Sequence, residues 1–230
     1  MEDTLLELLK SVDTPTVCNA IEVAQGKRGF NGFTRGTMLA SDPAGVMVGY
    51  ARTARIRAVA PPTEAPDVIK ARRMAYYKYM SEGARPAICV VQDLDVPNAI
   101  GAYWGEVNTN IHKAFGLSGT LTDGVMRDLA DLAEEYPVIA GSVGPSHGYV
   151  HVVDFDRPVR IHGLDIHPGD FVHADRHGAV VVPPDVIHSL HTAIETLMRS
   201  EKIVFDAVNG KHVTFAEFET AWAAFEAART

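Results

Sequence analysis

Arg127 and Asp128 stand side by side at the end of the sequence GVMRD, where the preceding LTDG predicts the start of a helix. Neighbouring residues on a helix point about 100° apart, so we expect the two side chains to serve different parts of one ligand rather than each other. An arginine offers a planar pair of donors to a carboxylate or phosphate, and an aspartate can hold a hard cation. The pair therefore indicates a site for an anion together with a metal ion.

A second junction between a loop and a helix lies upstream, at Trp104, Gly105 and Glu106. Helix N-termini expose N–H groups with partial positive charge, and glycine allows a ligand to approach the backbone closely. Glu106 and Asp123 add carboxylates that can bind the waters of a cation. Magnesium keeps several waters and leaves positions for substrate oxygens. A 2-oxo acid could chelate this cation through its carboxylate and keto oxygens. The metal and the arginine would then stabilise the enolate that forms when the neighbouring C–C bond breaks, in aldol cleavage or in decarboxylation.

Each of these residues also has an ordinary structural explanation. Charged helical residues usually face solvent, and a glycine before a helix is usually a turn. The combination of the two junctions is what indicates a site. His147, in the histidine-rich segment 142–158, is a candidate for specificity or proton transfer, and an exposed loop histidine is the simpler explanation.

The hydrophobic pattern alternates strands and helices in the first half of the chain and is mostly β in the second half. Thr14 is expected to cap a helix that runs from Pro15 to about Val23. We predict strands at 46–59, 87–95 and the stretch SGTLTDG, helices at 66–83, 105–115 and 124–135, strands between 149 and 183, and helices at about 184–207 and 214–228. This order predicts an α/β protein. With no linker apparent, we expect one domain over residues 1–230, with its core at about 15–185.

The composition excludes several classes of protein. The chain has 230 residues, is 47% hydrophobic and carries a net charge of −8, which argues against nucleic acid or an anionic membrane as its partner. No signal peptide or transmembrane span is apparent. Cys18 and Cys89 lie in apolar surroundings and are expected to be reduced. These features are typical of a cytoplasmic protein.

The site region resembles the RraA-like family. WGE is followed, 20 residues later, by R-D-x-x-D, with GLSGTLTDGVMRD between them, and the segments GYARTARI and PGDFVHADRHGAVVVP extend the resemblance over most of residues 45–185. Enzymes of this family are divalent-metal-dependent 4-hydroxy-4-methyl-2-oxoglutarate/4-carboxy-4-hydroxy-2-oxoadipate aldolases that also decarboxylate oxaloacetate. The resemblance implies an α/β/α sandwich like the phosphohistidine swivelling domain, assembled as homotrimers or homohexamers with sites at subunit interfaces.

The resemblance also implies roles for individual residues. Asp128 would be the direct ligand of magnesium or manganese, and Arg127 would bind the substrate carboxylate and support the enolate. Gly105 and the backbone at Val107 and Asn108 would grip the same carboxylate.

Further acids complete the implied site. By the resemblance, Glu106 would bind the metal through a water, and Asp131 matches the last position of the motif. Asp123 is a candidate for binding through water from its residue type alone. Glu201 is the candidate for a C-terminal glutamate supplied by a neighbouring subunit.

Two other functions stay open. Some members of the family are non-catalytic regulators that bind a ribonuclease and its helicase partners, and the presence of Arg127, Asp128 and Asp131 favours the enzyme over this alternative. The third alternative is the same lyase chemistry on a sugar-derived oxo acid.

Overall fold

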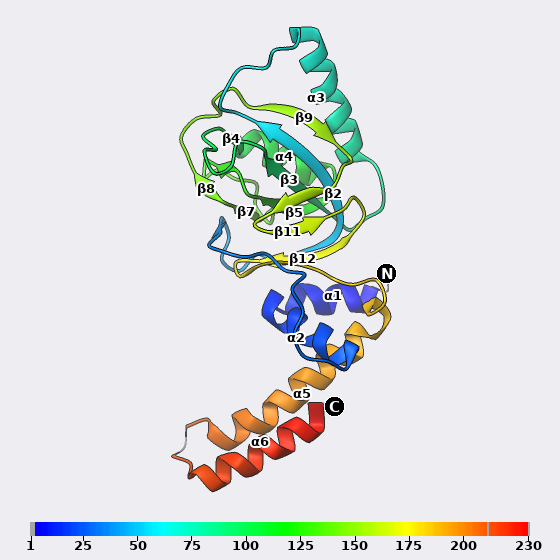
Figure 1. Cartoon of the computed structure of the whole chain (residues 1–230), viewed down its shortest axis with the longest axis vertical. Coiled ribbons are helices and arrows are strands. Elements are labelled where there is room, and N and C mark those ends of the chain that lie inside the picture. Colours follow the sequence, from blue (N-terminus) through cyan, green and yellow to red (C-terminus); the bar gives the residue numbers. More distant parts are fainter. Residues whose placement is uncertain (1–2, 211, 230) are drawn as a thin grey trace. The chain divides into compact units, whose positions relative to one another are not determined.

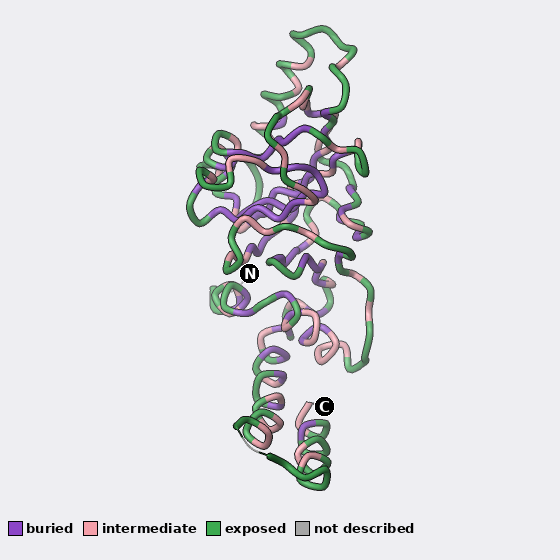
Figure 2. The backbone as a smooth tube through the Cα atoms, turned by 90° about the vertical axis from the view of Figure 1, so that its left-hand side faces the viewer, coloured by how far each residue is buried: buried purple, intermediate pink, exposed green. Residues whose placement is uncertain are grey.

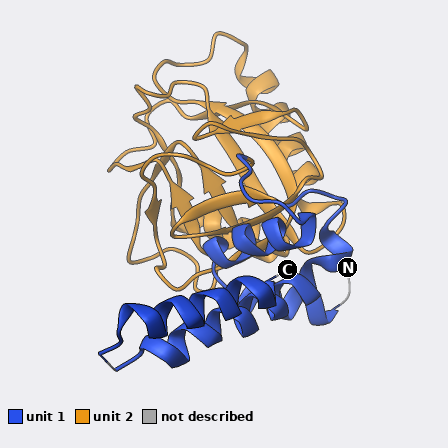
Figure 3. Ribbon diagram, turned by 60° about the horizontal axis from the view of Figure 1, so that its bottom comes forward, with its two compact units in different colours: residues 1–31, 182–230 blue, residues 32–181 orange. Residues whose placement is uncertain are grey.

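The computed structural model describes residues 3–210 and 212–229, which form two compact units (Figure 3). The sheet unit comprises residues 32–181. The helical unit takes in the described residues up to 31 and from 182 onward. Our expectation of one domain stays a prediction, because a compact unit need not fold alone.

The sheet unit is built on a mixed eight-stranded sheet (Figure 1). Its strands are β1 (Leu39–Ala40), β2 (Met47–Arg57), β3 (Ala87–Asp93), β5 (Leu117–Thr122), β7 (Val138–Ala140), β9 (His151–Phe155), β12 (Phe171–Asp175) and β13 (Gly178–Val181). They follow the order β1-β7-β5-β3-β2-β12-β13, with β9 also paired to β2. Strands β2, β3, β5 and β7 are parallel, and the other pairings are antiparallel. The apolar run of β3 fits its central place, because a central parallel strand is covered on both faces.

Smaller elements complete the sheet unit. They are a hairpin of β10 (Val159–Ile161) and β11 (Leu164–Ile166), the helices α3 (Pro66–Ser81) and α4 (Glu106–Ala114), and the strands β4 (Ala102–Trp104), β6 (Val125–Met126) and β8 (Ser142–Val143). The last three form a separate parallel sheet in the order β4-β6-β8. This small sheet carries both stretches that the sequence marks for chemistry.

The helical unit holds the two ends of the described chain. Its elements are α1 (Asp3–Ser11), α2 (Thr14–Gln25), the 3₁₀ turn η1 (Ile187–Ser189), α5 (Leu190–Val208) and α6 (Phe215–Arg229). Asp13, rather than the predicted Thr14, caps α2, because its carboxylate accepts the N–H of Thr16 at 2.9 Å. Gly26 ends that helix with φ +62°, in the left-handed region. Among the described residues, no helix is long and apolar enough to cross a membrane.

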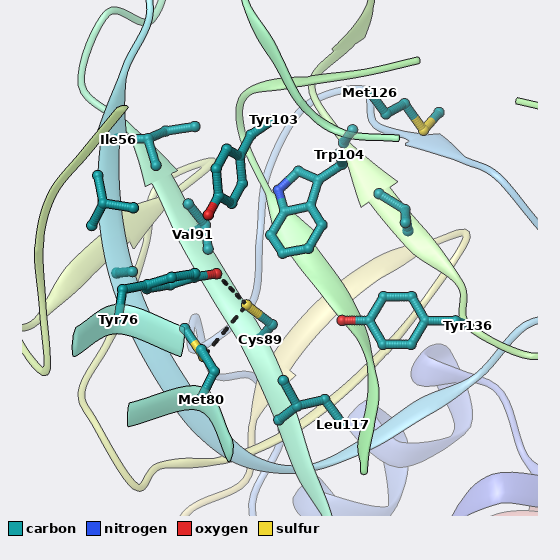
Figure 4. Packing of buried hydrophobic residues seen from close by; sticks show 14 of the residues in the cluster. Ile56, Tyr76, Met80, Cys89, Val91, Tyr103, Trp104, Leu117, Met126 and Tyr136 are labelled. Atoms are coloured by element: carbon teal, nitrogen blue, oxygen red, sulfur yellow. Dashed lines mark hydrogen bonds between the residues drawn. The ribbon is translucent and has the colours of Figure 1, made fainter. Parts of the chain in front are cut away.

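The core of the sheet unit lies on the central strands, which are almost wholly buried (Figure 2). On one face, aromatic side chains pack around Cys89 of β3 (Figure 4). The Tyr76 hydroxyl lies 3.7 Å from the Cys89 sulfur, and the ring of Tyr103 stacks edge-on against Trp104. Burial raises the pKa of Cys89 to about 12, so this thiol stays protonated.

The predicted fold class is confirmed: the chain is a mixed α/β protein with helices at its C-terminal end. The predicted β-rich second half and the two final helices are present close to their expected bounds. The helix predicted at 124–135 is wrong. The likeness to the phosphohistidine swivelling domain stays a prediction.

Candidate functional site

The small parallel sheet brings the two candidate stretches together. Trp104 of β4 stands opposite Met126 of β6, and the N–H of Arg127 donates to the Trp104 carbonyl at 2.8 Å. Gly105 and Arg127 therefore leave the carboxyl ends of neighbouring strands. Ligands commonly bind at this edge of a parallel sheet.

Arg127 and Asp128 do not lie on a helix. The Arg127 N–H is used by the small sheet, and Asp128 has φ +52°, in the left-handed region that a helix excludes. The two side chains are consequently neighbours, with 3.5 Å between Arg127 Nε and Asp128 Oδ2. Our expectation that they point apart is wrong, although both face the same junction.

Gly105 makes this arrangement possible. A Cβ at this position would lie 2.5 Å from Asp128 Oδ2 and 3.0 Å from Arg127 Nε, which is too close for any other residue without movement of the pair. The φ of Gly105 is −151°, an extended conformation open to all residues, so the requirement for glycine is one of space. The sequence interpretation of Gly105 as a point of close approach is consistent with this packing.

Asp128 also stabilises the start of α4. Its Oδ2 accepts the N–H of Glu106 at 3.2 Å, which places a carboxylate at the positive end of the helix. The next N–H groups, of Val107 and Asn108, have no acceptor within the described chain. These amides can therefore bind an anion beside Asp128.

Arg127 is the cation of this junction. Its Nε is buried and finds no hydrogen-bond acceptor among the described residues, although the side chain is 33% exposed overall. The guanidinium therefore has donors left for a ligand. The Asn108 side chain, by contrast, is engaged internally, donating to the Tyr103 carbonyl at 2.7 Å and accepting from the Tyr77 hydroxyl at 2.9 Å. A ligand would meet Asn108 through its backbone.

The acids at the junction fit a magnesium-like cation. The Asp128 carboxylate is 34% exposed, Glu106 is exposed at the helix start, and the exposed Asp131 follows in a turn closed by its N–H on the Asp128 carbonyl. No cluster of three or more His, Cys, Asp or Glu residues suited to a metal occurs in the described chain. This donor set fits a cation that keeps several waters, such as Mg²⁺ or Mn²⁺, and does not fit a zinc site closed by protein ligands.

Hydrogen bonds of a buried histidine join α4 to α3. The buried His112 lies 2.6 Å, through Nε2, from the Tyr76 hydroxyl and 2.6 Å, through Nδ1, from the Asn108 carbonyl. Burial lowers the pKa of His112 to about 4, so the neutral ring donates from Nδ1 and accepts from tyrosine at Nε2. Sequence reasoning missed this residue. The signal was its place in the helical stretch NIHKAF, where a histidine one turn after Asn108 faces the core.

Asp123 directly follows the last residue of β5, and its carboxylate contacts Asp93. Its Oδ1 accepts the N–H of Asp93 at 2.7 Å, and the residue is 9% exposed. Burial raises the pKa of Asp123 to about 7 and also raises the pKa of Asp93, whose buried Oδ2 has no hydrogen-bond partner in the described chain. No recorded contact joins Asp123 to Asp128, and its predicted role through a metal-bound water stays a prediction.

Asp123→Asn should change how stability depends on pH. The unfolded chain releases the Asp123 proton near the ordinary pKa of 3.8, whereas the folded chain keeps it to about pH 7. The free energy of unfolding of the wild type therefore falls as pH rises from about 4 to 7. Asparagine cannot ionise, so the variant does not lose this free energy. Urea unfolding at pH 5 and pH 8 measures the free energy of unfolding of both proteins. The difference between variant and wild type should shift in favour of the variant by up to a few kcal/mol from pH 5 to pH 8. The exposed Asp131→Asn serves as control, and an equal gain there would contradict the assignment.

The remaining candidates are not brought to this junction by any recorded contact. His147 is exposed, its Nδ1 donates to the Gly148 carbonyl at 2.7 Å, and its backbone carbonyl packs against Gly101 before β4. Glu201 lies on α5, in the helical unit. Both roles stay predictions.

The sequence matches one protein family over most of its length. The model of the family described as RraA-like, Aldolase/RraA, matches residues 14–181. Protein DlpA of Legionella pneumophila is 26% identical over 108 residues, which cover 46% of this chain and 18% of that protein. An uncharacterized protein of Methanocaldococcus jannaschii is 25% identical over 109 residues, which cover 46% of this chain and 52% of that protein. The matches thus cover less than two thirds of either relative.

Solved structures share the fold. An uncharacterized protein from Pseudomonas syringae pv. tomato has a TM-score of 0.69 at 21% identity, over 97% of this chain and 94% of that one. A protein described among novel cellulases from gut-associated microbes has a TM-score of 0.70 at 21% identity, over 88% and 87%. Streptomyces coelicolor RraAS2, described as an unusual member of the RNase ES inhibitor RraA family, has a TM-score of 0.62 at 23% identity, over 88% and 94%. At these identities the likeness establishes the fold alone.

Proposed function

The chain belongs to the RraA-like (Aldolase/RraA) family, and from this premise we propose that it is a divalent-metal-dependent lyase acting on a small 2-oxo acid. The family contains both lyases and ribonuclease regulators, so the proposal depends on the site. One observation carries it: Arg127, Asp128 and the free N–H groups of α4 converge on Gly105, where a Cβ would lie 2.5 Å from the Asp128 carboxylate. A purely structural turn does not require an arginine whose buried Nε has an ionic contact with Asp128 at 3.5 Å but no hydrogen bond in the described chain.

In the proposed reaction, Arg127 binds the carboxylate of the 2-oxo acid with two parallel donors, and the N–H groups of Val107 and Asn108 bind the same group. Asp128 would hold Mg²⁺ or Mn²⁺, with Glu106 binding through water. Such an ion, when bound, supplies a Lewis acid for the keto oxygen. The bond between C3 and C4 of the substrate then breaks, and its electron pair forms a pyruvate enolate whose negative charge Arg127 stabilises.

Proton transfer requires an acid–base group beside this junction. Glu106 is the candidate, because it is exposed at the first position of α4, next to the Asp128 carboxylate. In aldol cleavage it would take the proton of the C4 hydroxyl, and in decarboxylation the released group is CO₂. In aldol cleavage Glu106 returns that proton to C3 of the enolate, and in decarboxylation a water beside Glu106 supplies the proton and leaves hydroxide to solvent, so that both routes give pyruvate.

We propose that the protein assembles as a homotrimer or homohexamer, as the family resemblance implies, with Glu201 of a neighbouring copy completing the site. We also propose that this mixed α/β chain has the more specific fold of an α/β/α sandwich like the phosphohistidine swivelling domain. Cytoplasmic location is also proposed, from the expectation that Cys18 and Cys89 are reduced.

A pyruvate-release assay tests the lyase. Oxaloacetate and branched 4-hydroxy-2-oxo diacids should give pyruvate in the presence of Mg²⁺ or Mn²⁺, and EDTA should reduce the rate to background. A sugar-derived oxo acid belongs in the same panel, because the same residues would serve it. No turnover of any of these, or turnover indifferent to EDTA, contradicts the proposal.

The second candidate is a regulator that binds a ribonuclease. It stays open because the family includes ribonuclease regulators, and RraAS2, which shares the fold, is described as a member of an RNase ES inhibitor family. A regulator does not need the charged pair, so inhibition of a ribonuclease that survives loss of Arg127 and Asp128 would support it. A lyase loses its function in the same variants.

A further inference from the structure

A cavity in the helical unit lies outside the Gly105 junction. It has a volume of about 700 Å³ and is lined by residues from α2 and the turn after it, from η1 and α5, and from the end of α6. Pockets for small molecules commonly fall between about 300 and 1,000 Å³. The cavity therefore has room for a molecule of about nucleotide size.

Three cations line this cavity, although the chain as a whole has a net charge of −8. Lys27 and Arg28 are exposed and, among the described ion pairs, neither has an acidic partner. Arg229 is 15% exposed and has one acidic contact, to Glu22 at 3.4 Å. The exposed Glu226 is the other acid in the lining. The cations therefore exceed the acids by one.

Glu22 holds the cationic turn in place. Its Oε1 accepts the N–H of Gly29 at 3.0 Å, and the N–H of Lys27 donates to the Glu22 carbonyl at 3.2 Å. With Gly26 and Gly29 both in the left-handed region, the chain folds back over the end of α2. This anchoring fixes the backbone of Lys27 and Arg28 at the cavity, which lowers the entropy lost when their side chains bind a ligand.

Helix α5 contributes small side chains to the cavity, two of which carry hydroxyl groups. Thr192, Ala193 and Thr196 line the cavity from successive turns of α5. The Thr192 hydroxyl has no recorded partner in the described chain, and Thr196 receives a long hydrogen bond of 3.4 Å from Arg199. The lining thus combines apolar surface, from Val23, Ala24 and Ala193, with hydroxyls and positive charge, as is common in sites for small molecules.

We propose that this cavity binds a small phosphate-bearing metabolite. The phosphate group would meet Lys27, Arg28 and the remaining donors of Arg229, because a phosphate offers three acceptor oxygens to converging cations. The body of the ligand would lie along Thr192, Ala193 and Thr196. This site is independent of the lyase and places a second ligand on the helical unit.

Calorimetric titration of the full chain at about 0.15 M salt tests the site, where screening suppresses loose attraction between exposed charges. The probes are AMP, ribose 5-phosphate, inorganic phosphate and adenosine. AMP or ribose 5-phosphate should bind saturably, and adenosine, which lacks the phosphate, should not. Lys27→Ala/Arg28→Ala should weaken binding by about tenfold or more, since each lost charged hydrogen bond matters. Thr192→Leu, a change at an exposed helical position, should weaken it by filling the cavity.

Matched controls separate a built site from general charge. Lys70→Ala/Arg73→Ala removes the same charge from exposed positions of α3 and should bind as wild type does. Asp128→Asn should also bind as wild type does, which separates this site from the lyase. Equal losses in the two double variants, adenosine binding as well as AMP, or no saturable binding of any phosphate probe would overturn the proposal.

Discussion

Asp128→Asn should lower the kcat of metal-dependent pyruvate release by on the order of 10³-fold while leaving the fold intact. Asparagine tolerates the left-handed backbone that Asp128 adopts at φ +52°, and its amide oxygen can still accept the Glu106 N–H. What the variant loses is the charge of the carboxylate, which a divalent cation needs. Rates measured across a magnesium titration should show a weaker apparent metal affinity as well as a lower maximum.

The comparison with alanine and with a distant acid sharpens this prediction. Asp128→Ala should lose the same activity and some stability, because it removes the cap of α4 and because alanine tolerates the left-handed backbone at this position less well than aspartate or asparagine does. Glu134→Gln, an exposed acid in the turn after Asp131, should keep wild-type rates. Full turnover in Asp128→Asn, with an unchanged response to magnesium, would exclude Asp128 as the metal ligand.

The sequence was a good guide where local pattern and tertiary environment agree. The apolar run of β3 is a central buried strand, and Gly105 precedes a helix, as its place after Trp104 predicts. The helix prediction was wrong from Leu129 to Glu135, because the leucines, alanines and acids of this stretch favour a helix when no tertiary contact opposes it. Pairing of Arg127 with the Trp104 carbonyl overrides that preference, and no local pattern reveals a partner 23 residues away.

Contacts between distant segments account for the rest of what the sequence could not reveal. The hydrogen bond between Asp93 and Asp123 joins residues 30 positions apart and depends on the register of β3 against β5. The raised pKa of Asp123 follows from that burial and so was not predictable. The same holds for the cavity of the helical unit, since Glu22 and Arg229 meet across 207 positions.

The two charges of the junction have separable roles. Asp128 interacts with the chain itself, through the Glu106 N–H, so its loss affects both structure and metal binding. Arg127 makes no side-chain hydrogen bond in the described chain through its buried Nε. Its side chain does pair with Asp128 at 3.5 Å, and lysine keeps the charge for that pair, so Arg127→Lys tests substrate binding with little effect on the fold.

Arg127→Lys should reduce kcat/KM for pyruvate release by about 10²-fold or more. Lysine keeps the positive charge but presents one ammonium group in place of a planar fork, so it cannot bind a carboxylate and the enolate in the same geometry. The unfolding midpoint should stay near that of wild type. Inhibition by oxalate, which resembles the planar enolate, should weaken in parallel, because both depend on the same donors.

A matched arginine gives the control for this experiment. Arg160→Lys changes an exposed residue that pairs with Asp165 at 3.2 Å in the β10–β11 hairpin, and it should leave kcat/KM unchanged. Arg127→Met removes the charge as well as the fork and should be at least as damaging as lysine. If lysine retains full activity and methionine does not, charge alone matters and the bidentate role is wrong. If both retain it, Arg127 does not bind the substrate, and the junction at Gly105 loses its assignment as the lyase site.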